Sequence, residues 1–137
     1  MNKLILAYNF SSERLQALRL ICMMLKATCR PVERSEMLQP MGYLAGVKGI
    51  EPVAEAYDGD EGTEEMLYLC GFDRVSLDRL LAAIKKSKLQ RVHLKSMMTP
   101  HNVGWSGLAL IKELGEEHED MTKNGRPKPP EHTNTEA

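Results

Sequence analysis

The chain has 137 residues, of which 42% are hydrophobic and 27% are charged. This length and composition are ordinary for one globular domain, and they allow a core that needs neither disulfides nor a structural metal. The formal net charge of −1 gives the chain no general attraction to nucleic acid or to a membrane surface.

The three cysteines, Cys22, Cys29 and Cys70, are scattered and lie in apolar or strand-like segments. An odd, scattered set argues against a disulfide framework and indicates a reducing compartment. The apolar run Leu4–Tyr8 behind Lys3 is too short for the core of a signal peptide or for a membrane span. We therefore expect a cytoplasmic protein that does not associate with a membrane.

Two parts of the chain repeat one another. The segment Leu4–Phe10 matches Met66–Phe72 at an offset of 62 residues, and apolar residues follow both segments in step. We therefore predict a duplicated domain, with copy one at residues 3–50 and copy two at residues 66–121. An acidic, glycine-rich connector, residues 51–65, joins the two copies.

Each copy begins with a strand and a helix. The apolar runs that end at Phe10 and Phe72 are typical of buried strands. Ser11 and Asp73 follow these runs, and both residue types cap helix N-termini. Apolar residues then recur at helical spacing: Leu15, Leu18, Cys22 and Leu25 in copy one, and Leu77, Leu80, Leu81 and Ile84 in copy two.

A second strand and a second helix complete each copy. We predict the strands at Arg30–Arg34 and Arg91–Lys95, the latter because apolar and charged residues alternate in it. Thr99 and Pro100 then mark the start of a helix of several turns. The corresponding segment of copy one, Gln39–Val47, contains two glycines and is expected to form a short helix at best.

The folded part of the chain is predicted to end at Met121. Residues 1–121 then form a single domain, and residues 122–137 form a polar, proline-rich tail. Such a tail cannot bury enough apolar surface to fold, so we expect it to be disordered.

The order of these elements, β-α-β-α twice, defines the fold class. A strand-helix-strand unit crosses over with right-handed geometry, and its two strands are parallel. We therefore predict an α/β fold with a four-stranded sheet and packed helices, doubly wound, with the first strand of each copy at the centre. A ferredoxin-like α+β sheet is the alternative, because it too can be built from two such halves.

Several blocks of the sequence resemble a family of bacterial proteins. Gln39-Pro-Met-Gly-Tyr-Leu-Ala-Gly46 resembles one family signature, and Met66–Met121 resembles another, particularly at Cys70-Gly-Phe72, Leu94-Lys95, Thr99-Pro100-His-Asn102 and Trp105. The family is domain of unknown function 3783. The resemblance covers nearly all of the chain except the connector and the tail. It implies a fold type and a bacterial cytoplasmic setting, and it supplies no catalytic residues.

The turns after the second strands, Gln39–Tyr43 and Thr99–Trp105, form the candidate ligand site. In open α/β sheets, ligands bind beyond the carboxyl ends of strands, where helix N-termini favour an anion. The alternative, which we favour, is that Thr99 caps the helix and Trp105 packs in the core. The candidate binding residues are Gln39, Tyr43, His93, Lys95, Thr99, His101, Asn102 and Trp105.

We recognise no motif for a metal or for another cofactor. The spacing of Cys22 and Cys29 is not that of a metal site, and Asp58–Gly62 begins a calcium-loop pattern that then fails. No glycine-rich phosphate loop is present. The basic run Lys85–Arg91 follows a helix, where cations complement the dipole, and aromatic residues are only 5%, so nucleic-acid binding is not expected.

Two functions are compatible with these residues. The first is a non-enzymatic binding or interaction domain, with a protein partner or as a homodimer. It is favoured by the missing catalytic motifs and by Met41 and Met98 beside the candidate turns, because methionines suit adaptable contact surfaces. The second is a domain, or an enzyme, that binds a small anionic ligand at the paired turns. We prefer the first.

Overall fold

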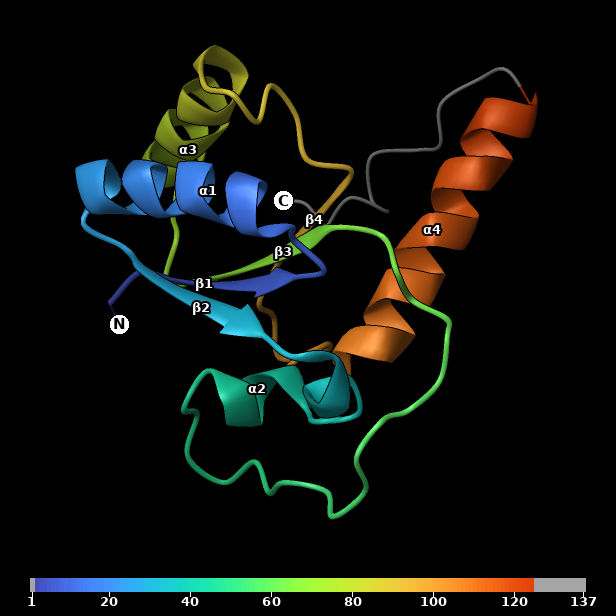
Figure 1. Cartoon of the computed structure of the whole chain (residues 1–137). Helices are drawn as coiled ribbons and strands as arrows, with labels where there is room; N and C mark the ends of the chain where they lie inside the picture. The colour runs from blue at the N-terminus through green and yellow to red at the C-terminus, as the bar shows by residue number, and fades with distance from the viewer. Residues whose placement is uncertain (1, 125–137) are drawn as a thin grey trace.

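Strands and helices alternate along the chain in the computed structural model, which describes residues 2–124 and the side chains of residues 2–116. They form a sheet with helices on both sides (Figure 1). In chain order the elements are β1 Leu4–Tyr8, α1 Ser12–Leu25, β2 Thr28–Val32, the 3-10 helix η1 Arg34–Glu36, α2 Met41–Leu44, β3 Met66–Cys70, α3 Arg74–Lys86, β4 Leu94–Met97 and α4 Gly107–Asn124.

The four strands form one mixed sheet in the order β2-β1-β3-β4. Strand β1 is parallel to β2, β3 is parallel to β4, and the central strands β1 and β3 are antiparallel to each other. The predicted α/β fold, with parallel strands within each copy and the first strands at the centre, is therefore confirmed. A ferredoxin-like sheet places another strand between the two strands of each unit, so that alternative does not form.

The order and directions of the strands are those that an internal two-fold axis, relating the two predicted copies, would produce. Leu6 of β1 pairs with Tyr68 of β3, and these residues are equivalent at the offset of 62. The antiparallel bridge between Pro40 and Ser106 also joins equivalent residues, at an offset of 66. Because a residue can pair with its own equivalent only on the axis, these two pairs mark where the axis passes.

Helices cover both faces of the sheet (Figure 1). Side chains alternate in direction along a strand, so Ile5 and Ala7 of β1 pack with α1 and α3, while Leu6 and Tyr8 pack with α2 and α4. Every residue of β3 is buried, as expected for a central strand that is covered on both sides. Two separate hydrophobic cores therefore hold the three layers together.

The predicted helix starts after β1 and β3 are confirmed by their caps. The Ser11 hydroxyl accepts a hydrogen bond from the Arg14 N–H at 3.3 Å. The Asp73 carboxylate accepts from the Ser76 N–H at 2.8 Å, and Ser76 Oγ accepts from the Asp73 N–H at 2.9 Å. These side chains satisfy N–H groups that no helical carbonyl can reach.

The second strands lie at other positions than predicted. Strand β2 begins two residues earlier, at Thr28, and β4 begins three residues later, at Leu94. Seven residues, 87–93, separate α3 from β4, whereas two separate α1 from β2. Val92 is buried within this longer loop, so its alternation with Leu94 imitates a strand. Copy two therefore carries four extra residues, which raise the offset from 62 to 66.

Helix α4 does not begin at Thr99 as predicted. Residues 99–105 form turns, and the helix begins at Gly107, where Ser106 Oγ accepts from the Ala109 N–H at 3.1 Å. The segment before α4 pairs with the segment before α2, so its backbone groups are used outside the helix. The expected short helix of copy one is confirmed, because α2 has four residues.

The connector, residues 51–65, is mostly exposed, but side chains of copy one hold it. Arg34 donates to Asn9 Oδ1 at 3.0 Å and to the carbonyl oxygens of Gly62 and Glu61, both at 2.8 Å. Asn9 Nδ2 also donates to the Gly62 carbonyl, at 2.7 Å. These bonds fix the end of the connector next to the end of β1.

The predicted C-terminal boundary of the domain falls inside α4. The helix continues to Asn124, three residues beyond the predicted end of the domain at Met121. The remainder of the predicted tail, residues 125–137, lies outside the described residues.

Candidate functional site

The buried side chain of Asn102 holds the turn after β4. Its Oδ1 accepts from the Tyr68 hydroxyl at 2.6 Å and from the Thr99 N–H at 3.0 Å. Its Nδ2 donates to the Met97 carbonyl at 3.0 Å, and its N–H donates to Thr99 Oγ1 at 3.1 Å. Burial raises the pKa of Tyr68, so this hydroxyl stays protonated and keeps donating. The polar atoms of Asn102 are thus engaged within the fold.

Copy one builds the equivalent turn with charged residues. At the offset of 66, Glu33 and Glu36 occupy the positions of Thr99 and Asn102. The Glu33 N–H donates to Glu36 Oε1 at 3.0 Å, and Arg30 Nη2 donates to Glu36 Oε2 at 3.2 Å. The sequence did not reveal this equivalence because the segment that begins at Thr99 was matched with the one that begins at Gln39. Allowing for four extra residues before β4 is the signal that could have found it.

The two turns meet on the internal axis and pack against each other. The Met41 N–H donates to the Trp105 carbonyl, and the Gly42 N–H donates to the Val103 carbonyl, both at 2.8 Å. A Cβ atom at Gly42 would lie 2.6 Å from Val103 Cγ2, so this approach requires glycine. Met41 is fully buried below the junction. The structure therefore joins the two predicted turns as a packed contact.

Three further candidate residues lie around this junction. Gln39 exchanges two hydrogen bonds with the Val53 backbone, at 2.8 and 3.0 Å, and so holds the connector. Tyr43 and His101 are exposed. The His101 ring lies 5.5 Å from the Trp105 ring and is tilted by 55°, while Trp105 packs against the core. The structure therefore brings His101 and Trp105 together at the surface.

Lys95 and His93 are not part of this junction. Lys95 neighbours the buried Ser96 along β4, so its side chain points to the opposite face of the sheet. Its Nζ donates to the Val92 carbonyl at 2.9 Å. Desolvation of this ammonium, together with the charge of Arg91, lowers the pKa of Lys95. His93 is exposed in the loop before β4.

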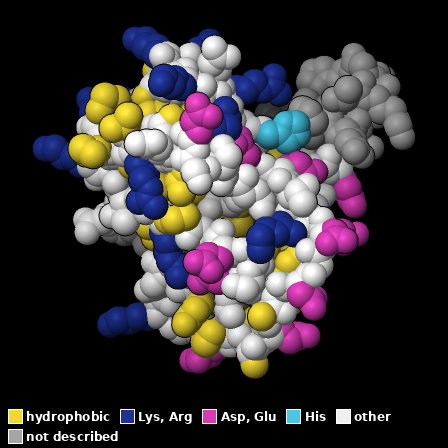
Figure 2. Space-filling model, viewed as in Figure 1, with side chains coloured by type: hydrophobic (Ala, Val, Ile, Leu, Met, Phe, Trp, Pro, Cys, Tyr) yellow, Lys and Arg dark blue, Asp and Glu magenta, His cyan; other side chains and the backbone are white. Residues whose placement is uncertain are grey.

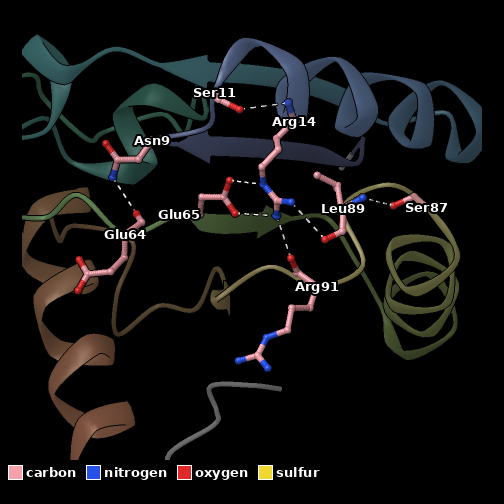
Figure 3. Close-up of polar contacts among 8 residues, drawn as sticks. All are labelled: Asn9, Ser11, Arg14, Glu64, Glu65, Ser87, Leu89 and Arg91. Carbon is pink, nitrogen blue, oxygen red and sulfur yellow. Dashed lines mark hydrogen bonds and ion pairs between the residues drawn. The ribbon is translucent and has the colours of Figure 1, made fainter.

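A second polar cluster surrounds Arg14 at the start of α1 (Figure 3). Its Nε and Nη2 bond both carboxylate oxygens of Glu65, at 2.5 and 2.9 Å. Nη1 donates to the Leu89 carbonyl at 3.2 Å, and Nη2 also donates to the Arg91 carbonyl at 2.9 Å. The hydrogen bond to Glu65 raises the pKa of Arg14. This cluster ties α1 to the start of β3 and to the loop after α3.

The cysteines are free thiols. A hydrogen bond with the buried thiol of Cys22 lowers the pKa of Cys29 to about 7, while burial raises the pKa of Cys70 to about 12. Among the side chains that the structure describes, no three His, Cys, Asp or Glu residues are grouped so that they could hold a metal ion.

An open groove of about 1060 Å³ lies between α1 and α3. Leu20, Met23 and Met24 of α1 line it, and these residues are 60%, 72% and 70% exposed. Ala83 and Lys86 line the α3 side. This surface is not among the sites predicted from the sequence, although Leu20, Met23 and Met24 stand at positions i, i+3 and i+4 of α1.

The fold is α/β, with strands and helices following one another as β-α-β-α twice along the chain. Residues 65–121, which contain the whole of copy two, match the family model of a domain of unknown function, DUF3783. This match confirms the resemblance for copy two, whereas the Gln39–Gly46 block of copy one lies outside it. No curated protein and no solved structure matches the chain. Within residues 2–124, every helix is too short or too polar to cross a membrane.

Proposed function

We propose that the protein is a non-enzymatic interaction domain and that the groove between α1 and α3 binds an α-helix of a partner protein. The observation that carries this proposal is the strip formed by Leu20, Met23 and Met24, which is left exposed along α1. The three free thiols are consistent with a reducing, cytoplasmic setting.

This strip borders the core side of α1, because Ile21 of the core also lines the groove. Leu18 and Ile21 are buried against the sheet, whereas Leu20, Met23 and Met24 point outward. Burying one such side chain contributes roughly 1.5–3 kcal/mol, so three of them supply a substantial part of what a specific complex needs. Exposed aliphatic side chains that gather in one place are typical of contact surfaces.

A helix is the occupant that the groove fits best. Two helices form its walls, and an amphipathic helix can lay apolar residues at i, i+3, i+4 and i+7 into such a groove. Met23 and Met24 have flexible side chains, which adapt to a partner surface more easily than branched ones.

The alternative, a small anionic-ligand domain or an enzyme at the turn before α4, has less support. The polar atoms of Thr99 and Asn102 bond each other, and Asn102 also bonds Tyr68. The helix start that was expected to face an anion lies further along the chain, at Gly107. An anion at the turn would therefore have to compete with hydrogen bonds that are already made.

The test is selection of a displayed library of helical peptides on the purified protein, followed by anisotropy measurements with the enriched peptides. We expect enriched peptides to share apolar residues at i, i+3 and i+7. Leu20→Glu should weaken their binding at least about tenfold, because it places a charge inside an apolar contact.

Val75→Glu is the matched control. Val75 is 61% exposed on α3 but does not line the groove, so the same substitution there should leave binding unchanged. Failure to enrich any helical peptide, or equal binding to wild type and Leu20→Glu, would overturn the proposal. Circular dichroism of both variants shows whether the fold is kept.

A further inference from the structure

We infer that the partner helix carries acidic residues beside its apolar face, so that the groove selects its partner by charge. This inference rests on the proposed function, because it names the chemistry of the partner that the same groove binds. It is carried by the charge distribution of the outer helical layer, which is independent of the apolar strip.

The layer formed by residues 12–26 and 73–88 is strongly basic. It contains eight Lys and Arg residues and three acidic residues, so its formal net charge is +5, whereas the whole chain carries −1. Arg14 contacts Glu65, and Arg74 contacts Asp78. The six remaining cations, all exposed, are Arg19, Lys26, Arg79, Lys85, Lys86 and Lys88.

Two of these cations lie beside the apolar strip. Lys86 and Lys88 line the groove directly, and Glu13 is the acidic residue among its described lining side chains. In Figure 2, hydrophobic side chains gather over the α1 and α3 side of the molecule, with Lys and Arg side chains around them. An apolar strip with a basic rim is complementary to an apolar helix face with acidic flanks.

A second copy of the chain is a poor occupant. Two grooves placed face to face would bring two +5 layers together, and like charges across an interface are unfavourable. The acidic helix α4 offers no described apolar face, because Leu110, Ile111 and Leu114 already pack on the sheet. The part of the chain that the structure describes therefore offers no free acidic helix with an apolar face, and the occupant we infer is a helix of another protein.

Nucleic acid fits this surface less well than an acidic helix. Phosphates would satisfy the lysines, but Leu20, Met23 and Met24 would remain exposed to water or face a polar backbone. Only 5% of the residues are aromatic, so stacking with bases gains little.

The experiment compares three synthetic helical peptides that share the apolar positions found by selection and differ in their flanks, which are Glu, Gln or Lys. We expect the Glu-flanked peptide to bind at least about tenfold more tightly than the Lys-flanked peptide in dilute salt. This difference should shrink in about 0.5 M salt, because exposed charges are then screened. The double variant Lys86→Glu/Lys88→Glu should reverse the order of affinities.

Lys48→Glu is the control, because Lys48 is exposed in copy one outside the groove. It should leave the order unchanged. Equal binding of all three peptides would overturn the charge inference while leaving the proposed function standing, whereas no binding of any of them would remove both. Tighter binding of single-stranded DNA or of phosphatidylglycerol vesicles than of the Glu-flanked peptide would assign the basic rim to another partner and overturn the inference.

Discussion

Two buried tyrosines on the same face of the sheet differ in one hydrogen bond. The Tyr68 hydroxyl donates to Asn102, whereas the Tyr8 hydroxyl has no partner among the residues that the structure describes. Burial raises the pKa of both, so both stay neutral at ordinary pH. The Tyr8 ring packs so closely on Gly107 that a Cβ atom there would overlap it. The Tyr8 ring therefore stabilises the fold by packing, whereas its unpaired buried hydroxyl lowers the stability.

This contrast predicts opposite effects of the same substitution. Tyr8→Phe should leave the free energy of unfolding unchanged or raise it by up to about 1 kcal/mol, because it removes an unpaired buried hydroxyl. Tyr68→Phe should lower it by about 1 kcal/mol, because Asn102 loses a donor. Urea denaturation monitored by circular dichroism measures both. Equal destabilisation by the two substitutions would contradict this account.

Among the elements, first strands and second strands differed in how well the sequence predicted them. The strands β1 and β3 were predictable because they lie at the centre and are continuous apolar runs, buried throughout except at Leu4. Strands β2 and β4 lie at the edges and are partly exposed, so their patterns are weak. In addition, Val92 is buried outside any strand, which shifted the predicted position of β4.

The start of α4 was mispredicted for a related reason. Thr99 and Pro100 are typical of a helix start, and Thr99 does close a turn through Asn102. The helix nevertheless begins at Gly107, because the intervening residues pair with copy one. This pairing is a long-range contact, and local sequence preferences do not contain it.

The cap of α3 gives a prediction for the effect of pH. Hydrogen bonds from Ser76 lower the pKa of Asp73 below its ordinary value of 3.8, so folding favours the ionised carboxylate. A lowered folded pKa stabilises the protein at neutral pH, and this contribution is lost as the pH falls below about 4. Asp73→Asn should therefore be less stable than wild type at pH 7, and the difference should shrink toward pH 3.

Thermal unfolding across this pH range measures the effect. Asparagine still caps helices, so the variant should fold and lose mainly the titrating charge. Ser76→Ala is the companion variant, because it removes the hydroxyl that bonds Asp73 and should reduce the same acid dependence. A stability difference that stays constant from pH 7 to pH 3 would show that Asp73 acts only as a neutral cap.

For the whole molecule, the sequence predicted two copies but not how their strands are arranged. Self-similarity at a fixed offset predicted two copies, and it could not reveal that their central strands run antiparallel around an axis. The groove between α1 and α3 follows from that geometry, because the axis places the two helices side by side on one face. The sequence indicated the candidate residues at the two turns individually. The structure packs the two turns against each other, which the sequence did not predict.

Side chains that join the two copies should be energetically coupled to each other, because they fix the position of one copy against the other. Arg14 joins copy one to Glu65, at the entrance to copy two, and the two side chains are only 33% and 20% exposed. A double-mutant cycle with Arg14→Met and Glu65→Gln should give a coupling of about 1 kcal/mol or more, because the pair is bidentate and partly shielded from water. The control cycle uses Arg74 and Asp78, which lie 3.9 Å apart within α3 and are 88% and 67% exposed. This exposed pair should give at most about 0.5 kcal/mol. Equal couplings in the two cycles, measured by urea denaturation, would mean that Arg14 holds the copies together only through the Leu89 and Arg91 carbonyls.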